Sequence, residues 1–271
     1  LKLSSKPSAL YYFQLSDAWR QLKRPARALA VAEEGLHLFS SAIELNNAAG
    51  IALSDLGRND EAIVAFQSAL KLNPNDTNSN FNLARALLSL DRRDEAIAHL
   101  ERSLVQQPTF PDALSLLGRL ELESDHLELA GRYLKRLYDS NPQAPAARQL
   151  MAEWHLRSGL IADKQQDSRS AERHYITGIE LDPNASELYI RLGTLCLVQD
   201  RFTDALKPLE IFHHQQPNDP QGYLYLGQDY TKLGRIADAR RILSEGVQVA
   251  DHAGRSSTAA HCQTLLAQLP E

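Results

Sequence analysis

Residues 56–74 read LGRNDEAIVAFQSALKLNP, and the features of this stretch recur along the chain. Ala62 belongs to a set of seven alanines separated by 34 residues, except for one interval of 41. The set is Ala28, Ala62, Ala96, Ala130, Ala171, Ala205 and Ala239. Pro74, which ends the stretch, has a counterpart at the same place in four other repeats. A period this regular predicts a stack of supersecondary repeats, each burying its core against its neighbours.

Two further positions of the repeat indicate a pair of antiparallel helices. With the alanine numbered as position 20, position 8 is small, as in Gly50 and Gly227, and position 24 is bulky, as in Phe66 and Leu243. Small residues let two helix backbones approach closely, and bulky residues fill the adjoining space. The second helix ends before each proline, because proline lacks an N–H and pushes the preceding residue out of the helical conformation.

This pattern resembles the tetratricopeptide repeat family, most clearly in residues 56–74 and in LGQDYTKLGRIADA at 226–239. The resemblance implies an all-α fold, a right-handed α-solenoid of about seven two-helix repeats with a C-terminal capping helix. We expect residues 1–271 to form this single solenoid of fifteen helices. The expected repeats are 9–42, 43–76, 77–110, 111–144, 145–185, 186–219 and 220–253, and the capping helix covers about residues 256–269.

Glycine positions help to set the register of the repeats. Gly57 and Gly234, at position 15, suit the left-handed residue that ends a helix. Repeat five carries seven extra residues within 151–175, which is about two helical turns. We expect them to lengthen its first helix, to about residues 146–166, with a loop insertion as the alternative. Gly159 fits position 15 counted from the start of this repeat, and position 8 counted back from Ala171.

Two residues depart from the pattern. Glu121 stands at position 11 of repeat four, where an apolar residue is expected, and a small helix rotation would let it reach water. Pro208 lies inside the second helix of repeat six, so we expect a kink or a delayed helix start there.

Composition narrows the class of protein. The net charge of −5 and the pI near 6.0 do not suit a surface that neutralises nucleic-acid phosphates, so we expect no nucleic-acid partner. No segment approaches the apolar length of a membrane span, and we expect a soluble protein. Cys196 and Cys262 are expected to be free thiols. The chain begins at Leu1 without Met, which suggests a piece of a longer protein and leaves the compartment open.

The resemblance also implies a concave groove lined by the first helix of each repeat, through positions 2, 5, 6, 9, 12 and 13. The candidate protein- or peptide-binding residues are Asn82, Arg85, Leu88, Leu116, Arg119, Leu122, Leu150, Glu153, Leu156 and Arg191. The leucines form a stripe beside two arginines, which suits an extended peptide with apolar side chains and an acid. The alternative is that these leucines only pack and the arginines are only solvated.

Sequence signals for chemistry are weak. His213 and His214 are adjacent, so their side chains project about 100° apart and do not chelate a metal as an i, i+4 pair would; we read them as an exposed polar helix end. No zinc-protease, phosphate-loop or nucleophile-elbow motif occurs. We therefore expect no catalytic residues, no metal and no cofactor. Neither the carboxylate clamp nor the asparagine ladder known in the family fits the groove positions.

These observations favour a non-enzymatic scaffold that binds a peptide or protein segment in its groove. The alternative is an accessory or oligomerisation domain of a larger enzyme whose catalytic part lies outside this sequence. Self-association is a further option for the partner, whose identity the sequence leaves open.

Overall fold

The computed structural model describes residues 7–270, and within them the chain forms fifteen α-helices and no strand. The all-α helical-repeat prediction is therefore confirmed. The start of the chain at Leu1, on which the expectation of a longer protein rests, lies outside the described residues. Contacts divide the chain into an N-terminal unit, Leu1–Leu120, and a C-terminal unit, Glu121–Glu271.

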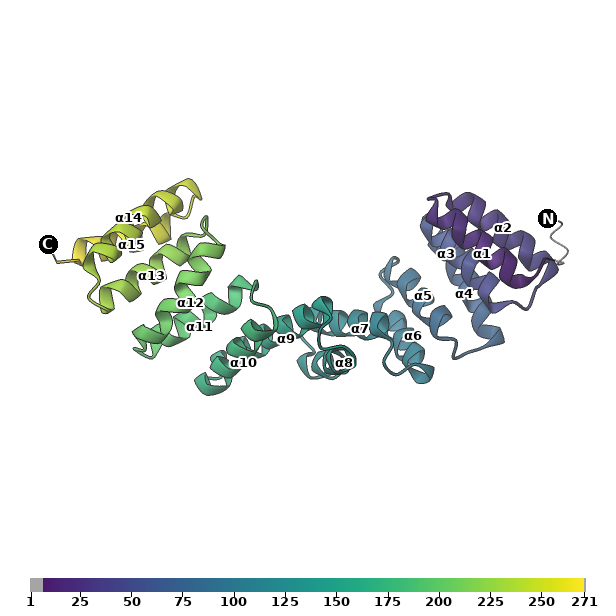
Figure 1. The fold of residues 1–271 in the computed structure, drawn as a ribbon, viewed down its shortest axis with the longest axis horizontal. Coiled ribbons are helices and arrows are strands. Elements are labelled where there is room, and N and C mark those ends of the chain that lie inside the picture. Colours follow the sequence, from purple (N-terminus) through teal and green to yellow (C-terminus); the bar gives the residue numbers. More distant parts are fainter. Residues whose placement is uncertain (1–6, 271) are drawn as a thin grey trace. The chain divides into compact units, whose positions relative to one another are not determined.

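The N-terminal unit holds three helix pairs, which Figure 1 shows as successive hairpins. They are α1 (Ala9–Gln21) with α2 (Pro25–Leu38), α3 (Ile43–Asp55) with α4 (Asn59–Leu72), and α5 (Thr77–Leu88) with α6 (Arg93–Gln106). Each helix contacts its partner in the pair, and α3 also contacts α1, α2 and α5. The next helix, α7 (Pro111–Glu123), begins in this unit and ends in the C-terminal one.

The C-terminal unit continues the same arrangement. Its helices are α8 (Leu127–Ser140), α9 (Pro145–Lys164), α10 (Ser168–Leu181), α11 (Ser186–Val198), α12 (Phe202–Gln215), α13 (Pro220–Lys232), α14 (Ile236–His252) and α15 (Ser256–Gln268). Helix α15 packs on both α13 and α14, as expected for a capping helix. None of the helices within residues 7–270 combines the length and the apolar character needed to cross a membrane.

The repeated small and bulky residues build the core. All seven alanines at position 20 are completely buried. A Cβ atom added to Gly50 would lie 2.4 Å from the Phe66 ring, and one added to Gly227 would lie 2.4 Å from Leu243. Position 8 therefore has to be small because the side chain at position 24 occupies the space above it.

Each hairpin turn uses one residue in the left-handed conformation. Gly57 (φ 75°) and Gly234 (φ 71°) have it as predicted. The other five hairpin turns use the non-glycine residues Lys23, Asp91, Asp125, Gln166 and Asp200, with φ between 55° and 62°. Three of these are aspartates, which tolerate this region better than most residues because their short side chain can bond locally.

The extra residues of repeat five lengthen its first helix, as predicted, and α9 runs unbroken over twenty residues. Gly159 lies inside α9, where an added Cβ would be 2.4 Å from the Tyr175 ring. It therefore occupies position 8, and the turn residue is Gln166. The insertion consequently lies in the N-terminal part of α9. Groove positions counted from residue 145, the start of this repeat, therefore fall on residues that lie about two helical turns, or ~10 Å, before the structurally equivalent ones.

Three other expectations have clear outcomes. The prediction that Glu121 reaches water is wrong, because Glu121 is buried and its Oε2 lies 2.8 Å from His126 Nδ1. The prediction that α12 starts late is also wrong, because the helix begins at Phe202 and continues through Pro208. Both cysteines are free, as predicted, and both are buried.

Candidate functional site

A small pocket lies on the face of the N-terminal unit formed by the first helices of repeats two and three. Its volume is about 70 Å³, and it is lined by Ile51, Ser54, Phe66, Asn82, Arg85, Ala86 and Ser89. Two of the predicted ligand-binding residues, Asn82 and Arg85, are therefore brought together here. The pocket has an apolar base and a polar rim, which is the usual character of a site that orients a ligand through a few polar groups.

A buried polar network holds α3 and α5 in position beside this pocket. Asn47 on α3 donates to Ser79 Oγ on α5 (2.7 Å), and Ser79 in turn donates to Asp76 Oδ2 (2.6 Å). Asp76 is the N-cap of α5 and also accepts from the Ser79 backbone N–H (2.7 Å). Because buried polar groups are costly to leave unpaired, this network favours one relative position of the two helices.

Arg85 and Arg119 are exposed. The Arg85 guanidinium lies 5.9 Å from the ring centroid of Phe81, which itself packs edge-on against Phe110 at 5.2 Å. Within residues 7–270, neither arginine forms an ion pair with a carboxylate of the chain. Both guanidinium groups are thus available to an acidic ligand.

The leucine stripe is not exposed as a whole. Leu88 and Leu116 are half-buried, so each has some surface to offer a ligand. Leu122 and Leu150 are buried, with exposed fractions of 1% and 9%. Packing against other side chains removes these two leucines from solvent, so they offer a ligand little surface, and they are not part of the site proposed below.

The candidates of the C-terminal unit are already engaged within the chain. Glu153 accepts from Arg157 (3.0 Å), and Arg157 also donates to the Leu122 carbonyl oxygen at the end of α7 (2.9 Å). Arg191 forms an ion pair with Glu187 (2.6 Å), one helical turn away.

Leu156 is half-buried and packs on the core cluster that contains Tyr175. In the register set by Gly159, the residues at positions 6, 9 and 12 of this repeat are Arg157, Leu160 and Asp163. The three predicted residues of α9, Leu150, Glu153 and Leu156, lie two turns before them.

Sequence reasoning missed part of the N-terminal site. Ile51, Ser54 and Ser89 line the pocket, and Phe81 supports Arg85. All four lie at the groove positions of repeats two and three, so reading every groove position in those repeats would have found them.

Metal ligands do not gather in the described part of the chain. No group of three or more His, Cys, Asp or Glu side chains there is arranged to hold a metal ion. The reading of His213 and His214 as an exposed polar end holds for His214 only. His213 is half-buried, and its ring packs edge-on against Tyr223 at 4.4 Å.

Comparison with known proteins gives the class of this chain. Two tetratricopeptide repeat family models match, over residues 53–120 and 156–220. Together with the seven-fold register and the helix pairs, these matches show that the chain belongs to the tetratricopeptide repeat family. No curated protein matches the sequence.

Solved structures show the same fold at low identity. One is the C-terminal part of a TPR repeat-containing protein from Cytophaga hutchinsonii, with 14% identity, a TM-score of 0.65, and coverage of 88% of this chain and 95% of that one. A second is a tetratricopeptide repeat protein from Parabacteroides merdae, with 14% identity, a TM-score of 0.53, and coverage of 94% and 98%. A third is YrrB, described as a TPR protein with an unusual peptide-binding site, with 16% identity, a TM-score of 0.56, and coverage of 70% and 95%.

Proposed function

We propose that the protein is a non-enzymatic scaffold whose first-helix face in the N-terminal unit binds an extended acidic peptide segment of a partner protein. The observation that carries this proposal is the pocket that joins Asn82 and Arg85 on one surface. Arg119, at the same position of the next repeat, extends the cationic surface. The structural likeness to YrrB, a protein described by its peptide-binding site, supports the same class of ligand.

The surface matches the chemistry of such a segment. The two arginines supply charge-assisted hydrogen bonds to carboxylates. Asn82 offers an amide donor and acceptor, which suits a peptide backbone. Half-buried Leu88 and Leu116 offer apolar contact at each side of these polar groups. Extended peptides are commonly recognised in this way. Polar groups of the protein fix the orientation of the peptide, and adjacent apolar surface supplies affinity.

The test compares two double charge reversals. Partners captured by the parent chain are identified, and their binding segments are titrated against R85E/R119E and against K164E/K232E. The second variant changes the net charge equally at two exposed lysines that lie elsewhere.

We expect R85E/R119E to bind at least about tenfold more weakly, because two charge-assisted bonds of ~1.5 kcal/mol each are lost. K164E/K232E should bind like the parent. Equal binding by both variants would show that the ligand does not use this face.

A further inference from the structure

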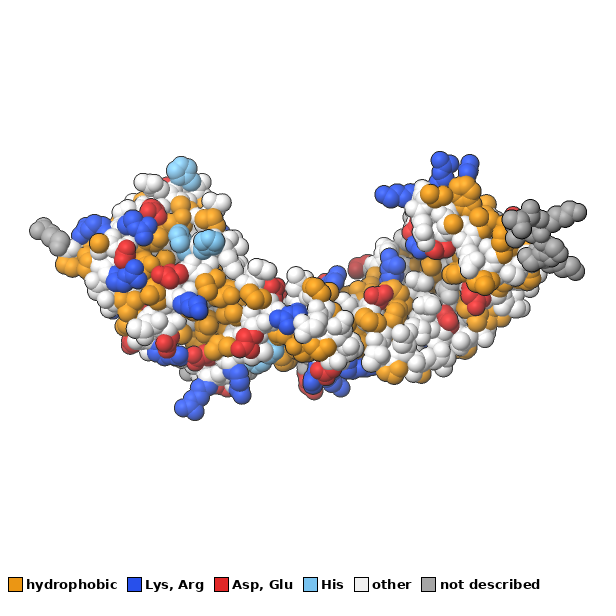
Figure 2. Space-filling view, in the orientation of Figure 1, with side chains coloured by type: hydrophobic (Ala, Val, Ile, Leu, Met, Phe, Trp, Pro, Cys, Tyr) orange, Lys and Arg blue, Asp and Glu red, His pale blue; other side chains and the backbone are white. Residues whose placement is uncertain are grey.

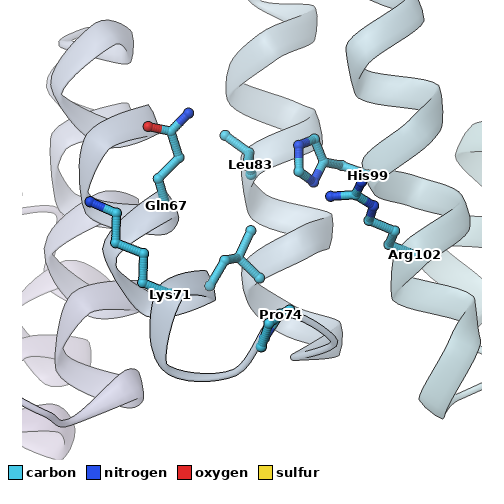
Figure 3. Close-up of a pocket in the computed structure, with 7 residues that line it drawn as sticks. Gln67, Lys71, Pro74, Leu83, His99 and Arg102 are labelled. Carbon is cyan, nitrogen blue, oxygen red and sulfur yellow. The ribbon is translucent and has the colours of Figure 1, made fainter.

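A second pocket lies between the second helices of repeats two and three. Its volume is about 310 Å³, and Gln67, Leu70, Lys71, Pro74, Leu83, His99 and Arg102 line it. Figure 3 shows Gln67 and Lys71 on one helix, α4, and His99 and Arg102 on the other, α6, with Leu83 of α5 between them. This volume is at the lower end of the range for pockets that hold small ligands or anchoring side chains.

This pocket is separate from the site described above. Leu83 lines the larger pocket, whereas Arg85 lines the smaller one. The residues near α5 that line the smaller pocket, Asn82, Arg85, Ala86 and Ser89, project on average about 110° from Leu83. The two pockets therefore lie on different faces of α5 and share no lining residue. A ligand in one pocket therefore leaves the other open.

The rim of the second pocket is cationic. Lys71 and Arg102 line it, and no Asp or Glu does. Within residues 7–270, neither of these cations is in an ion pair with a carboxylate of the chain. By contrast, the arginines at the starts of α4 and α6 are paired, Arg58 with Glu61 and Arg92 with Glu95. Two unneutralised cations on a chain of net charge −5 make this a local site for an anionic group.

Hydrogen bonds around His99 determine which of its ring nitrogens can accept a hydrogen bond from a ligand. The Asn80 amide Nδ2 donates to the carbonyl oxygens of Pro74 and Asp76, both at 3.0 Å, so its Oδ1 must be an acceptor. His99 Nδ1 lies 2.9 Å from that oxygen and is therefore the protonated nitrogen. Burial, and then the nearby Arg102 charge, lower the pKa of His99, while Glu95 opposes the shift, so the neutral form of the ring is favoured. Nε2 is left as a hydrogen-bond acceptor, and peptide N–H groups are suitable donors for it.

We propose that this pocket binds a partner peptide through an apolar side chain next to a carboxylate. The apolar side chain packs on Leu70, Pro74 and Leu83. The carboxylate is held by Lys71 and Arg102, and the peptide backbone bonds to Gln67 and His99 Nε2. The protein thereby has two peptide sites in its N-terminal unit, on different faces of α5.

The lining favours a peptide carboxylate over free phosphate. Phosphate sites typically use backbone N–H groups at the start of a helix, where the helix dipole is positive. Here the residues contributed by α4 come from its second half, and Lys71 lies in its last turn. The negative end of the helix dipole disfavours a compact dianion at such a place but tolerates one carboxylate between two flexible cations.

The test uses two-dimensional amide NMR of the full chain, titrated with a capped hexapeptide that carries one Leu-Glu pair among Gly and Ala. We expect saturable shifts centred on Lys71, His99 and Arg102. K71E/R102E should bind at least about tenfold more weakly than the parent. The neutral variant K71Q/R102Q, which adds no repulsion, should also bind more weakly. K164E/K232E is the charge-matched control and should keep the parent's affinity.

Matched probes separate the alternatives. A peptide with Gln in place of Glu, and one with Ala in place of Leu, should each bind more weakly than the Leu-Glu peptide. If inorganic phosphate competes fully and the Leu makes no difference, the pocket is an anion site and the proposal fails. It also fails if no saturable shifts appear at low-millimolar peptide. Shifts that are lost in R85E/R119E but kept in K71E/R102E would place the peptide on the other face, which contradicts this inference and leaves the function proposed above intact.

Discussion

Asp229 is a carboxylic acid at a helix position that is apolar in every other repeat. The corresponding residues are Ala18, Ala52, Ala86, Leu120, Ile161 and Leu195. Asp229 is completely buried, and within the described residues neither of its carboxylate oxygens has a hydrogen-bond partner. Burial, and then the nearby Glu210 charge, raise its pKa to about 6, while Arg235 opposes the shift. An unpartnered buried carboxyl is a local source of instability once it is ionised.

This leads to a pH-dependent prediction for D229N. The pKa of Asp229 is about 6 in the folded chain and near 4 in the unfolded chain, so the folded state binds more protons between these values. The free energy of unfolding of the parent therefore falls as pH rises through this window. D229N removes that loss and should be more stable than the parent by on the order of 2 kcal/mol at pH 8, with little difference at pH 4.

Urea unfolding at both pH values measures the effect. D251N changes an exposed aspartate on α14 and is the matched control, expected to match the parent throughout. A constant difference between D229N and the parent at both pH values would mean that ionisation of Asp229 is not the cause.

At the scale of single elements, α15 closes the C-terminal end of the stack. Ala259 and Cys262 of this helix are buried, and Cys262 belongs to the core cluster that contains Leu243. The Arg240 side chain on α14 also donates to the Pro270 carbonyl oxygen (2.7 Å). A terminal repeat without such a cover would expose an apolar face to water.

Removal of residues 254–271 should therefore destabilise the chain, by on the order of 3 kcal/mol, because several buried apolar side chains lose their contacts. The truncated chain should also bind a hydrophobic dye. Thermal unfolding and dye fluorescence measure the two effects. H261A/Q263A changes only exposed residues of α15 and should behave like the parent. An unchanged midpoint after truncation would show that α15 does not cap the stack.

At the scale of the whole molecule, charges of both signs are interspersed. Figure 2 shows Lys and Arg side chains beside Asp and Glu side chains over both units on the face in view. The sequence pI is near 6.0, a value that treats all nine histidines as ordinary. Folding changes this balance, because desolvation by burial is the main cause that lowers the pKa of His99, His155, His174 and His213.

The folded chain should therefore have a lower isoelectric point than the unfolded chain. Lower pKa values at four histidines remove positive charge near pH 6, most completely at His155, whose pKa is about 4, whereas the raised pKa of the single Asp229 removes less than one negative charge. His155 and His174 contribute to the effect together, because their Nδ1 atoms lie 3.0 Å apart and a hydrogen bond between them requires one of the two nitrogens to be unprotonated. Isoelectric focusing with and without urea measures the difference. Focusing at the same pH in both conditions would contradict the lowered histidine pKa values.

The sequence by itself determined the elements. The 34-residue spacing of alanines, the prolines and the small residue at position 8 predicted fifteen helices, the long α9 and the capping α15, because helix periodicity and turn chemistry are local properties of the chain. It also indicated Arg85 and Asn82, because groove positions follow from the repeat register. The register of α9 was misplaced by two helical turns. The local sequence could not decide between the two registers, since Gly159 suited a position in each.

Tertiary packing decided the rest. Only the Tyr175 ring against Gly159 fixed the register of α9, and only contacts from other helices buried Leu122 and Leu150. The pocket that gathers Lys71 and Arg102 likewise exists only because α4 and α6 lie on either side of α5. The physical reason is that the solvent exposure of a side chain and its hydrogen-bond or packing partners depend on atoms from distant parts of the chain. Sequence periodicity indicates only which side of a helix a residue lies on.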